Sequence, residues 1–226
     1  MGFSEPWLWR IRYELTSQWR KVSHRLRLAM LARGKDSGYR DYLKAQYIRT
    51  YGRAETGELK LRTRLLVDRL ADLKVFDNRP VVLCIGCRNG KELDYIRSKG
   101  AADVIGIDVI SVRPDILVMD MHALTFPGNM FGLVYACHSL EHALDPAQVG
   151  REIVRVLRPG GVVAIEVPVD FPANLVDRNN YRDKEGIKDC FAGCRVEELW
   201  TEQEPIKSPR NSEGTSIVRV ILRIWK

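Results

Sequence analysis

The sequence predicts an α/β fold: a doubly wound, mainly parallel sheet of seven strands with a C-terminal antiparallel hairpin and an N-terminal helical extension. Three observations predict it. Short β-forming runs alternate with segments of helical spacing between residues 81 and 167, which is the pattern of parallel βαβ units. Two further β-forming runs follow without a long helix between them, and helical segments precede the first strand.

The charge distribution divides the chain into two parts. Residues 1–75 contain 17 lysines and arginines against 8 acidic residues, whereas residues 76–226 contain 19 against 21. We therefore predict a basic helical arm over residues 1–75 and a near-neutral domain over residues 76–226. A basic arm can meet phosphates, acidic lipid or an acidic substrate, or it can be a solvated helical face.

Three helices are expected in the arm: residues 5–33, 39–51 and about 56–73. Seven apolar residues of the first helix, from Leu8 to Met30, recur at steps of three and four and form one stripe. Its arginines and lysines lie largely off this stripe. The turn "DNRP" at residues 77–80 then leads into the first strand.

The domain that follows alternates strands and helices. Strands are expected at residues 81–85, 103–107, 115–119, 131–136 and 161–167, and helices at residues 90–99 and 146–157. The stretch "LRPGG" (157–161) ends the second helix with a proline and two glycines. The last two runs, at residues 195–203 and 215–226, are expected to form an antiparallel hairpin at the edge of the sheet.

Composition limits the class of protein. The chain of 226 residues is 45% hydrophobic and 29% charged, as in globular proteins. No apolar run reaches the roughly 20 residues that span a bilayer, and charges interrupt the N-terminus, so we expect neither a membrane span nor a signal peptide. Five cysteines without regular spacing indicate reduced thiols and a cytoplasmic location.

Polar residues gather where the strands are expected to end, which is where a doubly wound sheet binds its ligand. The glycine turn from Gly86 to Gly90 can present backbone N–H groups. Asp108 ends the second strand, 22 residues after Gly86, where an acid reaches ribose hydroxyls. Asp120 ends the third strand and can accept a hydrogen bond from an exocyclic amine such as that of adenine. The turn lacks two glycines of a dinucleotide loop, so a mononucleoside ligand is favoured.

Four segments in order resemble the motifs of the class I S-adenosylmethionine-dependent methyltransferases, in the group that acts on small molecules. "VVLCIGCRNG" is similar to the first motif, V-L-D-I-G-C-G-x-G, and "GIDV" to the motif that follows it. "MDMHALTFPGNMFGLVYACHSLEHALDP" resembles the acidic loop and the fourth motif, and "REIVRVLRPGGVVAIEVP" resembles the next helix, turn and strand. The resemblance covers residues 79–168 closely. It implies a Rossmann-like fold, S-adenosyl-L-methionine as cofactor, and a small-molecule acceptor methylated on oxygen, or else on nitrogen or carbon.

The resemblance also implies a set of cofactor-binding residues at or just after the strand ends: Gly86, Cys87, Arg88, Gly90, Asp108, Val109, Asp120, Met121, His122, Cys137 and His138. The glycine turn and the end of the fourth strand would hold the methionine part of the cofactor. Asp108 would hold the ribose hydroxyls, and the three residues from Asp120 would flank the adenine.

Two positions depart from the family pattern. Cys84 stands where the family usually has an acid, which helps to order the loop and the ammonium group of the cofactor. Arg88 stands where the family usually has glycine; it can pair with the cofactor carboxylate or point into solvent. Glu92 can replace some of the lost negative charge. The alternative is therefore a degenerate cofactor-binding or scaffold protein without turnover.

The stretch "HSLEH" supplies the candidate catalytic residues. His142 is the first candidate for a general base and His138 the second, with Glu141 to orient either; alternatively, the segment only shapes its loop. The same letters match the H-x-x-E-H pattern of inverted zinc peptidases, but Asp145–Pro146 interrupts the helix that such a site needs. We therefore predict no metal site.

Two other features have open roles. Cys84, Cys87, Cys190 and Cys194 could be drawn together as a zinc site, but a small buried cysteine in a strand is more often core. Residues 170–194 are expected to complete the acceptor pocket. Their Arg178, Tyr181 and Arg182 either meet an anionic or phenolic acceptor or are loop surface.

The basic arm allows three roles. We favour a lid whose apolar stripe packs over the cleft. The second role is association with an anionic membrane surface, since Trp7, Trp9 and Trp19 lie among arginines, which would make the protein a peripheral membrane methyltransferase. The third is contact with nucleic acid, as in an RNA methyltransferase, which the near-neutral domain makes the weakest. The sequence predicts no oligomeric state.

Overall fold

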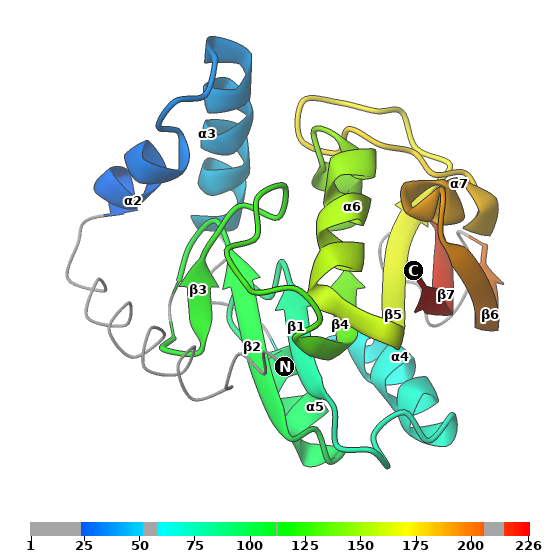
Figure 1. Ribbon diagram of the computed structural model, residues 1–226. Helices are drawn as coiled ribbons and strands as arrows, with labels where there is room; N and C mark the ends of the chain where they lie inside the picture. Colours follow the sequence, from blue (N-terminus) through cyan, green and yellow to red (C-terminus); the bar gives the residue numbers. More distant parts are fainter. Residues whose placement is uncertain (1–23, 52–57, 112, 206–214) are drawn as a thin grey trace.

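The computed structural model describes residues 24–51, 58–111, 113–205 and 215–226, and Figure 1 shows the path of the chain. Seven strands form one sheet in the order β3-β2-β1-β4-β5-β7-β6. The strands are β1 (Val81–Ile85), β2 (Asp103–Asp108), β3 (Ile116–Val118), β4 (Phe131–Cys137), β5 (Leu157–Val169), β6 (Arg195–Glu204) and β7 (Ser216–Trp225).

The sheet has the predicted topology. Strands β1 to β5 pair in parallel, and β7 pairs antiparallel with both β5 and β6. The predicted doubly wound sheet with a C-terminal antiparallel hairpin is thus confirmed. One strand differs: β5 begins at Leu157, which already pairs with Phe131, and the register then shifts before Val162 pairs with Leu133. The "LRPGG" stretch therefore ends the helix but continues directly into the sheet through this irregularity.

The helices of the described residues are α2 (His24–Leu31), α3 (Ser37–Tyr51), α4 (Leu61–Asp72), α5 (Lys91–Ser98), α6 (Pro146–Val156) and α7 (Lys184–Lys188), with 3-10 turns η2 (Leu140–His142) and η3 (Asp189–Phe191). The start of α6 follows from local chemistry. The Asp145 side chain accepts a hydrogen bond from the Gln148 N–H at 2.9 Å, and Pro146 occupies the first turn, where no donor is needed.

Two apolar clusters place the helices on the sheet. On one face, α6 buries Val149 and Ile153 against β1, β4 and β5. On the other face, α4 and α5 bury Leu66 and Leu93 against the same strands. Figure 1 shows α6 lying across the sheet in front, with α4 and α5 at the opposite side. Helix α4 is therefore part of the packed body, although the sequence prediction placed it in the arm.

Little of the predicted N-terminal helix falls within the described residues. Of residues 5–33, the structure describes α2 and the turn that follows it, and residues 1–23 lie outside the described part of the chain. Two residues of the predicted stripe, Leu26 and Met30, are half exposed, at 52% and 50%. The described end of the stripe is thus not packed against the domain.

A buried ion cluster crosses β5, β7 and β6 at one level of the sheet. Arg219 has no exposed side-chain surface, and its register partners are Glu166 on β5 and Glu202 on β6. Its Nε donates to Glu166 at 2.5 Å, and its Nη1 donates to Glu202 at 2.8 Å and to Glu204 at 2.6 Å. This guanidinium balances buried carboxylates on both neighbouring strands, which joins the hairpin to the parallel sheet electrostatically.

Replacing Arg219 with Met should lower the free energy of unfolding by about 3–5 kcal/mol, because Glu166 and Glu204 would lose their shared buried cation. Urea unfolding measures the change. Arg223→Met on the same strand is the control, since Arg223 pairs with Glu197 at 3.4 Å on the exposed surface and should cost less than about 1 kcal/mol. Similar losses of unfolding free energy in the two variants would show that the buried cluster stabilises the protein no more than the exposed ion pair does.

Candidate functional site

A cavity of about 200 Å³ opens at the carboxyl ends of β1, β2 and β4. Its position follows from the strand order, because the chain leaves β1 for β2 on one side and later returns to β4 on the other. Such a switch point leaves a crevice between the loops that diverge from the two strand ends. The cavity is lined by Gly86, Asp108 and Cys137 at the three ends, together with residues that follow β3.

Most of the residues proposed from the sequence line this cavity: Gly86, Arg88, Asp108, Val109, Asp120, Met121, Cys137, His138, Glu141 and His142. Cys87, Gly90 and His122 do not. Cys87 is fully buried beneath the turn, where its Sγ lies 3.6 Å from the Ile107 carbonyl oxygen. Gly90 is the N-cap of α5, in the left-handed conformation. His122 is also buried, so these three residues support the cavity wall from behind.

The turn after β1 depends on one glycine. Gly86 has φ +74°, and a Cβ at this position would lie 2.6 Å from the Cβ of Ser139 in the loop after β4. Arg88 also has a positive φ, of 41°, which explains why glycine is common at this position in the family motif. His138, on the facing loop, has φ 53°. Arg88 and His138 thus both border the cavity with a positive φ, a backbone conformation that costs about 1–3 kcal/mol for each residue.

Asp108 is fixed in the cavity wall by backbone donors. Its Oδ2 accepts from the Arg88 N–H at 2.8 Å, and its Oδ1 accepts from the Val109 N–H at 2.7 Å. Burial raises the pKa of Asp108, and these backbone hydrogen bonds oppose the shift. The carboxylate oxygens keep further lone pairs, which a ligand with a pair of hydroxyls can use.

Asp120 is held from two sides. The His122 N–H and Nδ1 contact its Oδ1 at 2.9 and 2.7 Å, and the Tyr39 hydroxyl donates to its Oδ2 at 2.6 Å. Burial works against ionisation, but the hydrogen bonds from His122 and Tyr39 hold the pKa of Asp120 below its usual range. Asp120 is therefore an ionised acceptor that a helix from the arm already contacts.

Helix α3 covers the cavity, which sequence analysis did not predict. Its buried side is formed by Tyr42, Leu43 and Gln46, and these residues line the cavity. The Gln46 amide donates to the Val176 carbonyl at 3.0 Å, and Arg49 pairs with Asp177. The sequence gives little indication that α3 packs over the cavity, because the buried side of this helix mixes polar and apolar residues and forms no apolar stripe.

The segment that precedes α4 also enters the cavity wall. It contributes Glu58, Leu59 and Lys60, and the first turn of α4 adds Arg62 and Thr63. Within the described residues, α3 and this segment therefore cover the cavity, whereas Leu26 and Met30 of the predicted stripe do not line it. Cations and carboxylates both occur in this part of the wall.

The two candidate catalytic histidines have different surroundings. The ring nitrogens of His138 face two carboxylates: Nε2 lies 2.9 Å from Glu166 and Nδ1 lies 3.5 Å from Glu141. The Nδ1 of His142 lies 3.1 Å from Asp177 and 3.2 Å from the Val176 carbonyl oxygen. The two acceptors at Nδ1 favour a proton on that nitrogen, although the Arg49 guanidinium also lies 3.3 Å from it. The Nε2 of His142 is then the acceptor nitrogen, and it lies 3.8 Å from Glu141.

Asp177 completes this arrangement. Hydrogen bonds from His142, and then from Arg49, hold the pKa of Asp177 well below its usual range although burial opposes the shift. Ligand atoms of Glu141, His142 and Asp177 lie within 4.8 Å of one another, a spacing that can suit a metal ion. However, the Arg49 guanidinium already contacts Asp177 and lies 3.3 Å from Nδ1 of His142. A neighbouring cation of this kind opposes a metal ion, so we assign no metal here.

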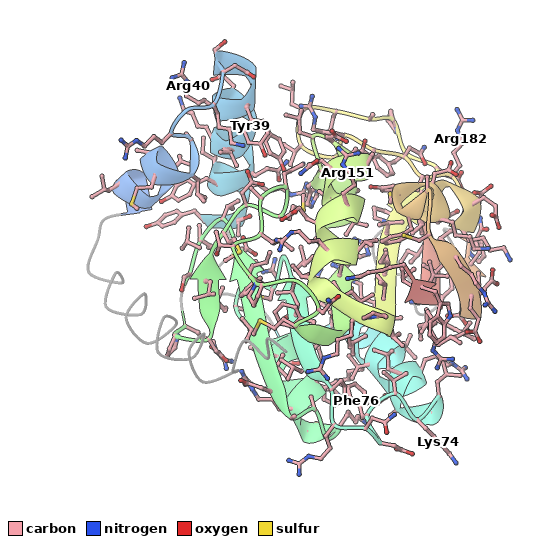
Figure 2. The ribbon with its side chains drawn as sticks, viewed as in Figure 1. Tyr39, Arg40, Lys74, Phe76, Arg151 and Arg182 are labelled. Atoms are coloured by element: carbon pink, nitrogen blue, oxygen red, sulfur yellow. The ribbon has the colours of Figure 1, made fainter. Side chains whose placement is uncertain are left out.

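The segment 170–194 supports the "HSLEH" loop instead of lining the described cavity. Tyr181 is buried, and its hydroxyl donates to the Leu140 carbonyl at 3.0 Å. The Asn179 amide donates to the Ala143 carbonyl at 2.6 Å. Figure 2 shows Arg182 pointing away from the body of the protein. None of Arg178, Tyr181 and Arg182 is in the cavity wall.

Changing Tyr39 to Phe should loosen α3, because it removes a hydrogen bond to a charged acceptor that is worth about 1.5–3 kcal/mol. Hydrogen exchange should show faster exchange of the α3 amides with unchanged protection in β1. Arg40→Ala is the control, since Figure 2 shows Arg40 on the side of α3 away from Tyr39 and the sheet. Unchanged α3 exchange in the Tyr39 variant would show that the contact with Asp120 does not hold the lid.

Comparison with known proteins identifies the domain. Residues 83–165 match the family model described as "Methyltransferase domain". The chain is 30% identical over 139 residues to 27-O-demethylrifamycin SV methyltransferase of Amycolatopsis mediterranei, covering 54% of this chain and 51% of the relative. It is 27% identical over 133 residues to the chloroplastic tocopherol O-methyltransferase of Arabidopsis thaliana, covering 50% and 38%. The chain thus spans about half, or less, of the length of these curated relatives.

Solved structures share the fold. A putative sarcosine dimethylglycine methyltransferase from Galdieria sulphuraria matches with a TM-score of 0.60 at 15% identity, over 81% of this chain and 98% of that chain. The 1,6-didemethyltoxoflavin-N1-methyltransferase of Burkholderia thailandensis, solved with bound S-adenosylhomocysteine, matches with a TM-score of 0.61 at 13% identity, over 83% and 89%. Residues 83–165 therefore match a methyltransferase domain, and the chain has the class I fold seen in S-adenosylmethionine-dependent methyltransferases.

Proposed function

We propose that the protein transfers a methyl group from S-adenosyl-L-methionine to an oxygen atom of a small-molecule acceptor. The observation that carries the proposal is the cavity at the switch point of a matched methyltransferase domain, with two fixed carboxylates in its wall. Oxygen is favoured as the methylated atom because two of the curated relatives are named for O-methylation. Nitrogen and carbon are the alternatives, since one structural neighbour is named as an N-methyltransferase and one curated relative as a sterol 24-C-methyltransferase.

The residues present fit the cofactor. Gly86 lines the cavity without a side chain, which lets Ser139 of the facing loop approach the turn and leaves the backbone of the turn uncovered by a Cβ. Asp108 is a buried acceptor for the ribose hydroxyls, and Asp120 is an ionised acceptor for the adenine amine. When bound, S-adenosyl-L-methionine supplies an electrophilic methyl group.

His142 is the residue that we assign to the acceptor's proton. Asp177 and the Val176 carbonyl hold its Nδ1, so Nε2 can accept the proton of an acceptor hydroxyl. His138 has carboxylates at both ring nitrogens, and we assign it a positioning role between Glu166 and Glu141. Helix α3 and the loops exclude water from the cavity and align the reactants, which provides most of the rate enhancement in a displacement reaction.

The first test is cofactor binding by calorimetry. S-adenosylhomocysteine should bind, whereas NAD should not. Asp108→Ala should weaken binding of S-adenosylhomocysteine about tenfold or more, because each hydrogen bond to a charged group is worth about 1.5–3 kcal/mol. Asp103→Ala is the matched control, since Asp103 lies exposed at the other end of the same strand. Failure of the unaltered protein to bind S-adenosylhomocysteine would contradict the proposed function.

A second candidate is a peripheral membrane methyltransferase acting on an apolar acceptor. Ile48, Tyr51, Leu61 and Leu175 are exposed by 62%, 56%, 53% and 80%. The first three flank cavity-lining residues in sequence, and Leu175 precedes Val176, which binds Gln46. Among the described residues no helix has the length and apolar character to cross a bilayer, so this association would be at the surface. We propose that the protein is cytoplasmic and associates with the cytoplasmic surface of such a membrane.

Vesicle sedimentation tests this candidate. The protein should sediment with anionic phosphatidylglycerol vesicles at low salt, and less at 1 M salt, where the Debye length is about 3 Å. Replacing Ile48 and Leu175 with Ser should reduce sedimentation several-fold, because both apolar side chains would insert at the interface. Leu73→Ser is the control, since Leu73 is exposed at the C-terminal end of α4. Equal sedimentation of all variants would exclude Ile48 and Leu175 as the residues that contact the membrane.

A further inference from the structure

The end of β1 lacks a negative charge that the family motif usually provides there. Cys84 is 1% exposed and packs in the apolar cluster beneath α4 and α5. Burial raises the pKa of the Cys84 thiol, and burial raises the pKa of Cys87 well above its usual value. Both thiols are therefore neutral near pH 7, and neither can balance a cationic group of a ligand.

Glu92 is a carboxylate of the cavity wall to which no role has been assigned. It is the second residue of α5, which begins directly after Gly90 in the turn that follows β1. Its side chain lines the cavity together with Gly86, Cys137 and His138, so it reaches the same region as the strand ends. It also lies close enough to influence the ionisation of Cys84 and Cys137.

Among the described residues, the carboxylate of Glu92 forms no ion pair. Arg88 and Arg62 are the cations whose charges favour its ionised form, but the described part of the chain contains no ion pair to Glu92. Burial raises the pKa of Glu92 to about 7, and Arg88 opposes the shift. A partly buried acid in this state gains from a cationic ligand group, because such a group favours the ionised carboxylate.

We propose that Glu92 binds the ammonium group of the cofactor's methionine part, in place of the acid that is absent at Cys84. This inference rests on the proposed function, because it takes S-adenosyl-L-methionine as the ligand. The methionine part carries a carboxylate as well as an ammonium group. Arg88 and Lys91 line the cavity beside Glu92, so the turn and the start of α5 offer cations for the carboxylate as well as an acid for the ammonium group.

The assignment predicts how binding depends on pH. The charged groups that act on Glu92 are Arg88 from the turn, Arg62 from α4 and Asp108 from β2. The titratable groups that also face it are Cys84, Cys87, Tyr135 and Cys137, and burial raises the pKa of each, so they stay neutral. Below pH 7 Glu92 holds a proton and cannot pair with an ammonium group. Affinity should therefore rise as pH increases through about 7, by roughly tenfold between pH 6 and pH 8.

Calorimetry with two probes tests the proposal. S-adenosylhomocysteine contains the amino-acid part, whereas 5′-methylthioadenosine lacks it. Glu92→Gln should weaken S-adenosylhomocysteine about tenfold or more at pH 8, leave 5′-methylthioadenosine unchanged, and abolish the rise in affinity between pH 6 and pH 8. Asp94→Asn is the control, since Asp94 is on the same helix but pairs with Arg113 outside the cavity.

A rescue variant separates replacement of the missing acid from a general effect of Glu92. Adding Cys84→Asp to Glu92→Gln should restore binding of S-adenosylhomocysteine, because it returns the charge to the position of the family motif. If the double variant does not fold, the comparison of the two probes in Glu92→Gln still decides. Equal effects on both probes, or none, would overturn the Glu92 assignment while leaving the proposed cofactor intact. Binding of neither probe by the unaltered protein would instead overturn the proposed function.

Discussion

The position of β1 between β2 and β4 is the constraint on which the site depends. Parallel pairing on both sides of β1 forces the chain to leave it in one direction and to return on the other, so loops diverge above the strand ends. Gly86 sits at this divergence, where a positive φ and the approach of Ser139 leave no space for a side chain. Without that close approach, the loops after β1 and β4 could not share one cavity.

Charge is distributed unevenly around the cavity. In the adjoining strands, Arg219 supplies a buried cation for carboxylates of β5 and β6. Within the cavity, Asp108 and Glu92 have raised pKa values because burial outweighs the stabilising groups nearby. Asp108 and Glu92 therefore differ from the carboxylates around Arg219. An acid whose pKa is raised by burial favours a ligand that supplies hydrogen-bond donors or a cation.

The lid links the arm to the domain through polar contacts. Tyr39 reaches Asp120 at one end of α3, and Arg49 reaches Asp177 near the other end. Both partners belong to loops that carry proposed ligand-binding groups, because Asp120 is the proposed acceptor for the adenine amine and Asp177 contacts His142, the proposed base. Helix α3 thus contacts both groups through its two ends.

The sequence by itself determined the fold and the strand-end acids. Alternating β-forming and helical segments located the seven strands, and the spacing from Gly86 located Asp108. These features depend on local propensity and on the rule that parallel strands present their ends together. Only the tertiary structure decided that α3 forms the lid, that His138 lies between two carboxylates and that Glu92 enters the cavity. These features depend on contacts between segments far apart in the chain and on burial. Neither produces a periodic pattern of residues from which it could be predicted.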